Sequence, residues 1–110
     1  MFLIRIGGHE VMTMGSMNYI EREVEGLRPD IALVGAAPSH LEIYQYTPKL
    51  MAALGYPSVV IPTHADNFRV PYGAATAYRE EWVSSFADEI RADARVIIPR
   101  HLEPIRLSVR

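Results

Sequence analysis

Apolar residues along the 110-residue chain form short continuous runs that alternate with stretches of helical spacing. Residues 2–6 and 10–14 flank the pair Gly7-Gly8, an arrangement that predicts a β-hairpin turning on the two glycines. Three further runs are typical of strands buried on both faces of a sheet, and they cover residues 31–34, 58–61 and 95–98. The pattern therefore predicts a sheet that opens with a hairpin and continues through three buried strands.

Helical spacing occupies the three segments between these strands, where the recurring apolar residues are Met17, Ile20, Val24 and Leu27; Leu50, Met51 and Leu54; and Tyr78, Trp82, Phe86 and Ile90. In the first segment Asn18 stands three residues before Glu21, which is the spacing of a capping box. In the second, we expect Thr47 at the N-cap, Pro48 at the first helical position and Gly55 just past the end. The spacing thus predicts three helices.

Strands and helices follow one another in the order β-β-α-β-α-β-α-β, without a repeat or a linker. This order predicts a single α/β domain over residues 1–110, with a mixed, mostly parallel sheet, flanking helices and an antiparallel hairpin at its start. We expect Pro62 to stop the strand that precedes it. The tail from residue 101 to 110 adds a candidate edge strand through Ile105 and Leu107.

Composition excludes several classes of protein. Apolar residues make up 49% and charged residues 22% of the chain, as in ordinary globular domains, so disorder is not expected. The formal net charge of −2 provides no basic surplus for nucleic acid or an anionic membrane. The absence of cysteine excludes disulfides and thiolate metal sites. No apolar stretch approaches the length of a membrane span, and we expect a cytoplasmic protein.

Candidate chemistry gathers where strands end, because functional loops leave the carboxyl ends of parallel strands. His64 directly follows a strand and offers an imidazole nitrogen to zinc or another divalent metal. Asp66 or Asn67 would orient the other ring nitrogen. The alternative is a loop histidine that hydrogen-bonds its own turn, beside an Asx-type turn. Both interpretations remain open at this stage.

Two other loops belong to the same predicted edge. Ser16 and Asn18 lie at a strand-to-helix corner, where they either cap the helix or face an anion. His40 either enters the same cleft or lies on the surface. His9, in the hairpin turn, and His101, in the tail, are expected to be solvated. No H-x-H or H-x-x-x-H pair is present, so the chain does not supply the three protein ligands that catalytic zinc requires.

The segment Ile61-Pro62-Thr63-His64-Ala65-Asp66-Asn67-Phe68 resembles one found in metal-dependent hydrolases of the metallo-β-lactamase fold. In that family a Pro-[Thr/Met]-His segment brings the final metal-binding histidine to the end of a late strand. Residues 14–20 fall where the family has a Gly-Asp or Gly-Ser turn, and residues 27–35 resemble the helix, Pro-Asp and buried strand that follow. The similarity covers nearly the whole chain but only the carboxyl-terminal half of such an αββα fold.

The resemblance implies that the chain is the carboxyl-terminal half, or a truncated form, of a zinc-type hydrolase that is inactive alone. His64 would be its last metal ligand, and Ser16 would occupy the place of a bridging aspartate. The pocket around them would be lined by Asp66, Asn67, Asn18 and His40. The family's H-x-H-x-D-H cluster has no counterpart here, so zinc or another divalent metal would need ligands from the missing amino-terminal half. A completed site would hydrolyse a small ester, lactone, amide or phosphoester.

A second hypothesis belongs to a different class: a non-catalytic α/β assembly module. Half of a two-sheet sandwich leaves one apolar sheet face uncovered, and such a face favours association. A second copy of the chain would be the commonest partner, which predicts a homo-oligomer that forms through the exposed sheet face or edge. A flavodoxin-like ligand binder is a weaker alternative, because no glycine fingerprint follows any predicted parallel strand.

Overall fold

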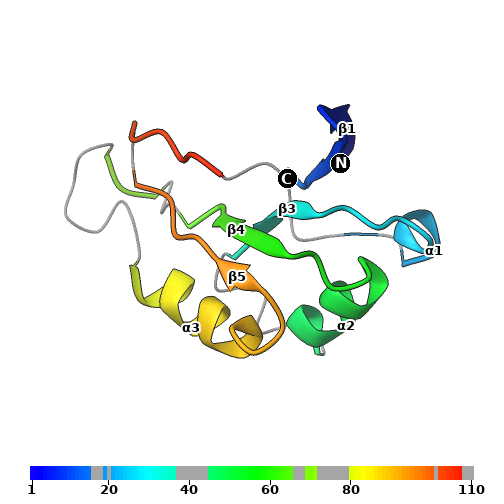
Figure 1. Ribbon diagram of the computed structural model, residues 1–110. Coiled ribbons are helices and arrows are strands. Elements are labelled where there is room, and N and C mark those ends of the chain that lie inside the picture. Colours follow the sequence, from blue (N-terminus) through cyan, green and yellow to red (C-terminus); the bar gives the residue numbers. More distant parts are fainter. Residues whose placement is uncertain are drawn as a thin grey trace.

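The computed structural model describes residues 1–15, 19, 21–36, 45–65, 69–71, 80–100 and 102–107. Over these residues the predicted element order is confirmed, and the chain folds as an α/β protein with one five-stranded mixed sheet (Figure 1). The strands are β1 (Phe2–Ile6), β2 (His9–Thr13), β3 (Ile31–Gly35), β4 (Val59–Thr63) and β5 (Arg95–Val96). The helices are α1 (Glu21–Val24), α2 (Tyr46–Ala53) and α3 (Glu80–Ile90).

The hairpin forms as the glycine pair predicts. β1 and β2 pair antiparallel with Ile6 opposite His9, so two residues make the turn. Those residues, Gly7 and Gly8, have φ values of 56° and 79°. A two-residue hairpin turn that matches the twist of its strands needs positive φ at both positions, and glycine adopts it without steric cost. The two glycines therefore set the register of the hairpin.

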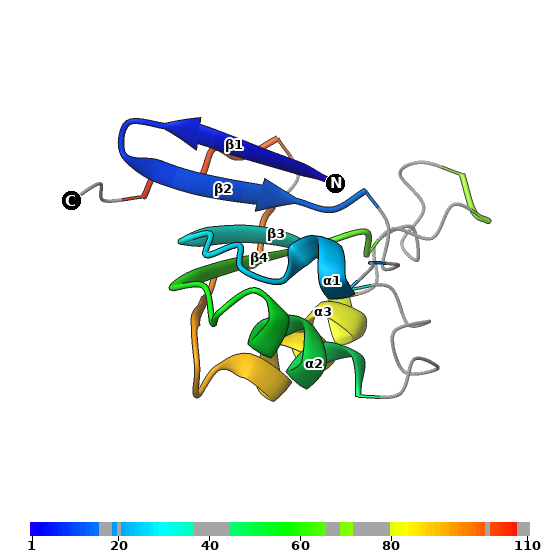
Figure 2. The same ribbon diagram turned by 90° about the vertical axis from the view of Figure 1, so that its right-hand side faces the viewer.

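From β2 onward the sheet is parallel and grows in one direction. Each following strand pairs with the one before it, which gives the spatial order β1-β2-β3-β4-β5. Parallel crossovers are almost always right-handed, so successive steps in one direction place every connecting helix on the same face. Figure 2 shows this result: α1, α2 and α3 lie together on one side of the sheet. One face of the sheet is therefore covered by helices, and we call the other its open face.

The core lies between the sheet and the helices. Its strand residues alternate along the chain, as expected for one face of a sheet, and its helix residues include the predicted face of α2. The core comprises Met12, Ala32, Val34 and Val60 from the strands, and Leu50, Met51, Leu54, Phe86 and Ile90 in and beside the helices. Tyr78 lies outside the described residues, as does the side chain of Trp82. The apolar faces predicted for α2 and for the described part of α3 are confirmed.

The expectation that the middle strands are buried on both faces is wrong for β3, whereas in β4 Val60 and Ile61, on opposite faces, are both buried. In β3, Ala32 and Val34 are buried against the helices, whereas Ile31 and Leu33 on the open face are half-buried. The register extends this open face across the sheet, because neighbours in register share a face. Its apolar residues are Phe2, Ile4, Ile6, Val11, Ile31, Leu33, Val59 and Ile61. The continuous apolar run of β3 therefore belongs to a strand that helices cover on only one face.

Pro62 does not end its strand, since β4 continues to Thr63. The reason lies in the direction of the backbone groups. The Val59 N–H donates to Asp30 in front of β3, whereas the Val60 carbonyl accepts from Ile97 beyond β5. Pro62 shares the orientation of Val60, so its missing N–H faces the side where β5 has already ended. Proline is tolerated in a strand where no neighbour requires its N–H.

The carboxyl end of α2 forms as the sequence predicts, whereas its amino end does not. The Tyr56 N–H donates to Met51 O at 2.9 Å and the Gly55 N–H to Ala52 O at 3.1 Å, which is a Schellman motif with Gly55 at φ 70°. The amino end differs: the N-cap is Gln45, with no side-chain capping bond. Thr47, expected at the N-cap, is instead the second residue of the helix and is 1% exposed.

The open face exposes large apolar side chains along β1, at one edge of the sheet. Phe2, Ile4 and Ile6 of β1 are 73%, 49% and 66% exposed. The segment of residues 102–107 lies on the side of the sheet away from the helices (Figure 1), and Ile61 of β4 is only 8% exposed. This segment forms no strand, so the predicted edge strand through Ile105 and Leu107 is wrong.

Among the described residues, no helix is long and apolar enough to cross a membrane.

Candidate functional site

The carboxyl ends of β2, β3 and β4 lie side by side, as the sequence predicts for parallel strands. Met14, just past β2, donates its N–H to Leu33 O at 3.0 Å. Ala36, just past β3, donates its N–H to Thr63 O at 2.8 Å. These bonds carry the ladder one residue beyond the strands and hold the three strand ends in register. We call this border, with His64 at the end of β4, the carboxyl edge.

His64 is the candidate functional side chain that the structure describes at the carboxyl edge. It follows the last residue of β4, it is exposed, and its backbone φ is 59°. A left-handed conformation costs a residue with a Cβ about 1–2 kcal/mol, and such residues concentrate at functional sites. An exposed imidazole on a fixed strand end can act as a metal ligand or as a proton acceptor.

Two tyrosines form the base of the carboxyl edge. Tyr46 at the start of α2 is 2% exposed, and its hydroxyl donates to Gly35 O at 3.1 Å. Burial raises the pKa of Tyr46, so this phenol remains a donor. Its ring contacts that of Tyr19, with centroids 6.2 Å apart and planes at 58°. Sequence reasoning missed Tyr46, because it precedes the helix start that Thr47-Pro48 suggested; its spacing of four residues from Leu50 was the signal that could have found it.

The structure does not describe the remaining predicted site residues. Ser16, Asn18, His40, Asp66 and Asn67 lie outside the described residues. Within the described ranges, no group of three or more His, Asp or Glu side chains comes together as a metal site. His64 is therefore not part of a complete ligand set formed by the described residues.

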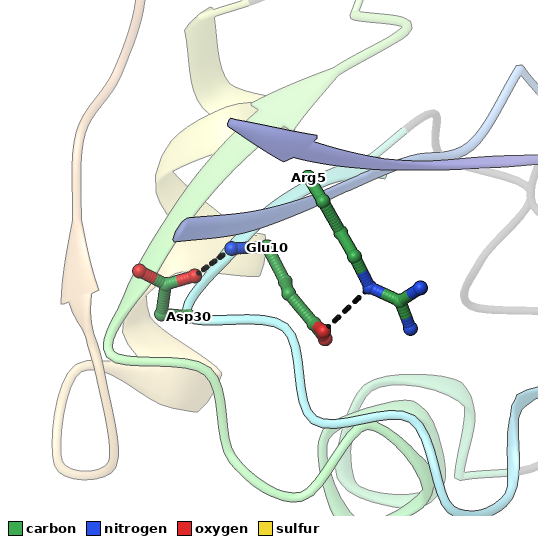
Figure 3. Close-up of polar contacts among 3 residues, drawn as sticks. All are labelled: Arg5, Glu10 and Asp30. Atoms are coloured by element: carbon green, nitrogen blue, oxygen red, sulfur yellow. Dashed lines mark hydrogen bonds and ion pairs between the residues drawn. The ribbon is translucent and has the colours of Figure 1, made fainter. Parts of the chain in front are cut away.

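A second polar cluster lies at the opposite end of the sheet, where β3 begins. Asp30 accepts a hydrogen bond at 2.6 Å from the backbone N–H of Glu10 (Figure 3). Its carboxylate also accepts a hydrogen bond from the ring Nδ1 of His9. The bond from His9, assisted by the Glu10 N–H, lowers the pKa of Asp30 against the opposing effect of burial. The ring Nε2 of His9 is buried and has no partner among the described residues. His9, expected to be solvated, instead ties the hairpin to β3.

The geometry separates the two described histidines by role. His9 joins two strands and has one ring nitrogen engaged and the other buried. His64 is exposed at a border where strand ends converge, so it is placed to meet an external group. No protein-family model matches the sequence, and neither the curated proteins nor the solved structures contain a match to it.

Proposed function

We propose that this chain is one sheet-and-helix half of a metal-dependent hydrolase of the metallo-β-lactamase fold. The observation that carries the proposal is the one-sided helix layer. An αββα fold consists of two sheets packed face to face with helices outside, so each half has helices on one face and apolar residues on the other. Both properties occur here, with α1, α2 and α3 on one side and Leu33 on the open face.

His64 supports the proposal from a second direction. It lies at the carboxyl edge, where the resemblance of residues 61–68 expects the final metal ligand. A zinc-type catalytic site needs three protein ligands, and the described residues contain no such cluster. The metal would therefore be bound between this chain and a complementing chain that carries the H-x-H-x-D-H cluster. The role proposed for this chain is to supply one imidazole and a sheet on which the other half packs.

The test is complementation. Co-purification with a complementing chain that carries H-x-H-x-D-H is expected to give stoichiometric zinc and turnover of p-nitrophenyl acetate or bis(p-nitrophenyl) phosphate. The chain alone is expected to give neither. Two variants separate the two roles: His64→Ala should lose zinc and turnover while the halves still associate, and Leu33→Asp should prevent association at the open face. Full zinc content in His64→Ala, or turnover with tightly held metal by the chain alone, would contradict the proposal.

The second candidate function is the non-catalytic assembly module. The observation that favours it is the exposure of Phe2, Ile4 and Ile6, three large apolar side chains on one side of one strand. An assembly module would self-associate and would show no zinc binding or turnover with any complementing chain. The complementation experiment therefore distinguishes the two candidates, because a hydrolase half gains metal and activity on mixing and a module gains neither.

A further inference from the structure

We propose that two copies of this chain pair along β1, antiparallel and about a two-fold axis, to form one continuous sheet. β1 is the terminal strand of the sheet, and among the described residues only β2 pairs with it. A terminal strand presents unpaired N–H and C=O groups, and natural sheets usually protect such edges with charge, proline or a covering segment. The sequence of β1, Phe-Leu-Ile-Arg-Ile, carries one charge and no proline.

The hydrogen bonds of Glu10 show which groups point outward. Its N–H donates to the Asp30 side chain and its carbonyl accepts from the Asp30 N–H, so both groups face β3 (Figure 3). Arg5 stands opposite Glu10 in the hairpin, and this pair is therefore one of those that exchange no backbone bonds. The backbone groups of Arg5 consequently point away from the sheet. The alternation of the ladder gives Leu3 the same orientation.

These outward groups are self-complementary. In an antiparallel pair of β1 strands centred on Ile4, Leu3 of each copy stands opposite Arg5 of the other, and the two exchange backbone bonds. The intervening positions are non-hydrogen-bonded pairs, in which side chains approach most closely. They place Ile4 against Ile4 of the second copy and Phe2 against Ile6 of the second copy. The three exposed apolar side chains of the strand are thus the ones that the pairing brings into contact.

Charge is compatible with this register. Arg5 carries the single charge of β1, and its Nε is 2.9 Å from the Glu10 carboxylate of the same copy. In the proposed pair, Arg5 faces Leu3 of the second copy rather than another arginine, so no like charges stand opposite each other. A five-residue edge is short, and an interface of this size belongs to the concentration-dependent class. The pairing extends the sheet sideways and leaves the open face of each copy free for another partner.

The experiment measures the oligomeric state by sedimentation and light scattering over a range of protein concentrations. Wild type is expected to be in monomer–dimer equilibrium. Arg5→Pro removes the outward N–H and Arg5→Ala keeps it, while both lose the ion pair with Glu10. Arg5→Pro should raise the dimer dissociation constant at least about tenfold relative to Arg5→Ala. A strictly monomeric wild type, or a folded Arg5→Pro that dimerises as Arg5→Ala does, would overturn the inference.

A charge exchange at Ile4 tests the register independently of proline. Ile4 is 49% exposed in one copy, so a charged side chain is tolerated there without loss of the fold. Ile4→Lys and Ile4→Glu each place like charges on the two-fold axis, and each alone should be monomeric. Mixing the two variants in equal amounts should restore a dimer, because lysine then faces glutamate. Failure of the mixture to dimerise would show that Ile4 does not lie on the axis and would overturn the proposed register.

Discussion

Both faces of the sheet carry apolar residues, but the chain buries them to different extents. On the helix side, Val34 and its neighbours are fully buried in the chain itself, so their burial stabilises the fold. On the open face, Leu33 is half-buried and Ile4 is 49% exposed. Adjacent residues of one strand therefore differ in how far the chain itself buries them. Hydrophobicity alone does not predict which of two neighbouring residues joins the core, whereas the side on which the helices lie does.

The largest effect is expected from a carboxylate placed on either side of β3. Val34→Asp buries a charge among apolar side chains and should lower the free energy of unfolding by more than about 4 kcal/mol, enough to unfold much of the protein. Leu33→Asp, its neighbour on the open face, should cost less than about 2 kcal/mol. Urea denaturation followed by circular dichroism measures both. Equal losses in the two variants would remove the distinction between the faces.

An intermediate effect is expected at Asp30, which joins the hairpin to the parallel strands. Asp30→Ala leaves the N–H of Glu10 and the ring of His9 without an acceptor and should cost about 1–3 kcal/mol. Asp30→Asn should cost less, because an amide oxygen still accepts from Glu10. The difference in the free energy of unfolding between Asp30→Ala and Asp30→Asn shows how much the hydrogen bond from Glu10 to Asp30 stabilises the fold.

The contribution of Asp30 should depend on pH in a defined direction. Its pKa is lowered in the folded protein, so the folded state favours the carboxylate. The stabilisation is present above the ordinary pKa of 3.8 and is lost as the pH falls through the lower folded value. The stability difference between wild type and Asp30→Ala should therefore shrink on acidification. A difference that grows as the pH falls would contradict this assignment.

The smallest effect is expected at the carboxyl edge. His64→Gly relieves a left-handed backbone and should raise the free energy of unfolding by about 0.5–1 kcal/mol. His64→Ala removes the same imidazole but retains a Cβ, so it should give no such gain. Thermal denaturation of the two variants separates backbone strain from the loss of the side chain. A gain in both variants would show that the imidazole itself is unfavourable, rather than the backbone conformation.

Local chemistry explains what could be predicted from the sequence. Gly7, Gly8 and Gly55 mark positions of positive φ, and the turns and the helix end that depend on them form as expected. Long-range arrangement explains what could not. Pro62 lies within its strand because β5 is short, and His9 is partly buried because Asp30, distant in sequence, lies beside it. At the candidate site, the position of His64 at the end of β4 was predictable, whereas its left-handed backbone was not.

The strand order has a consequence for how the protein acquires its structure. Because β1, β2, β3, β4 and β5 are neighbours in space in the same order as along the chain, every strand pairs with one that precedes it directly in sequence. Each parallel pair is still joined by a crossover that contains a helix, and the loop-closure entropy of such pairing makes parallel sheets slow to form. During synthesis the strands of this chain emerge in their spatial order, so each crossover unit finds the strand on which it docks already synthesised. The sheet can assemble progressively during translation, without waiting for a distant segment.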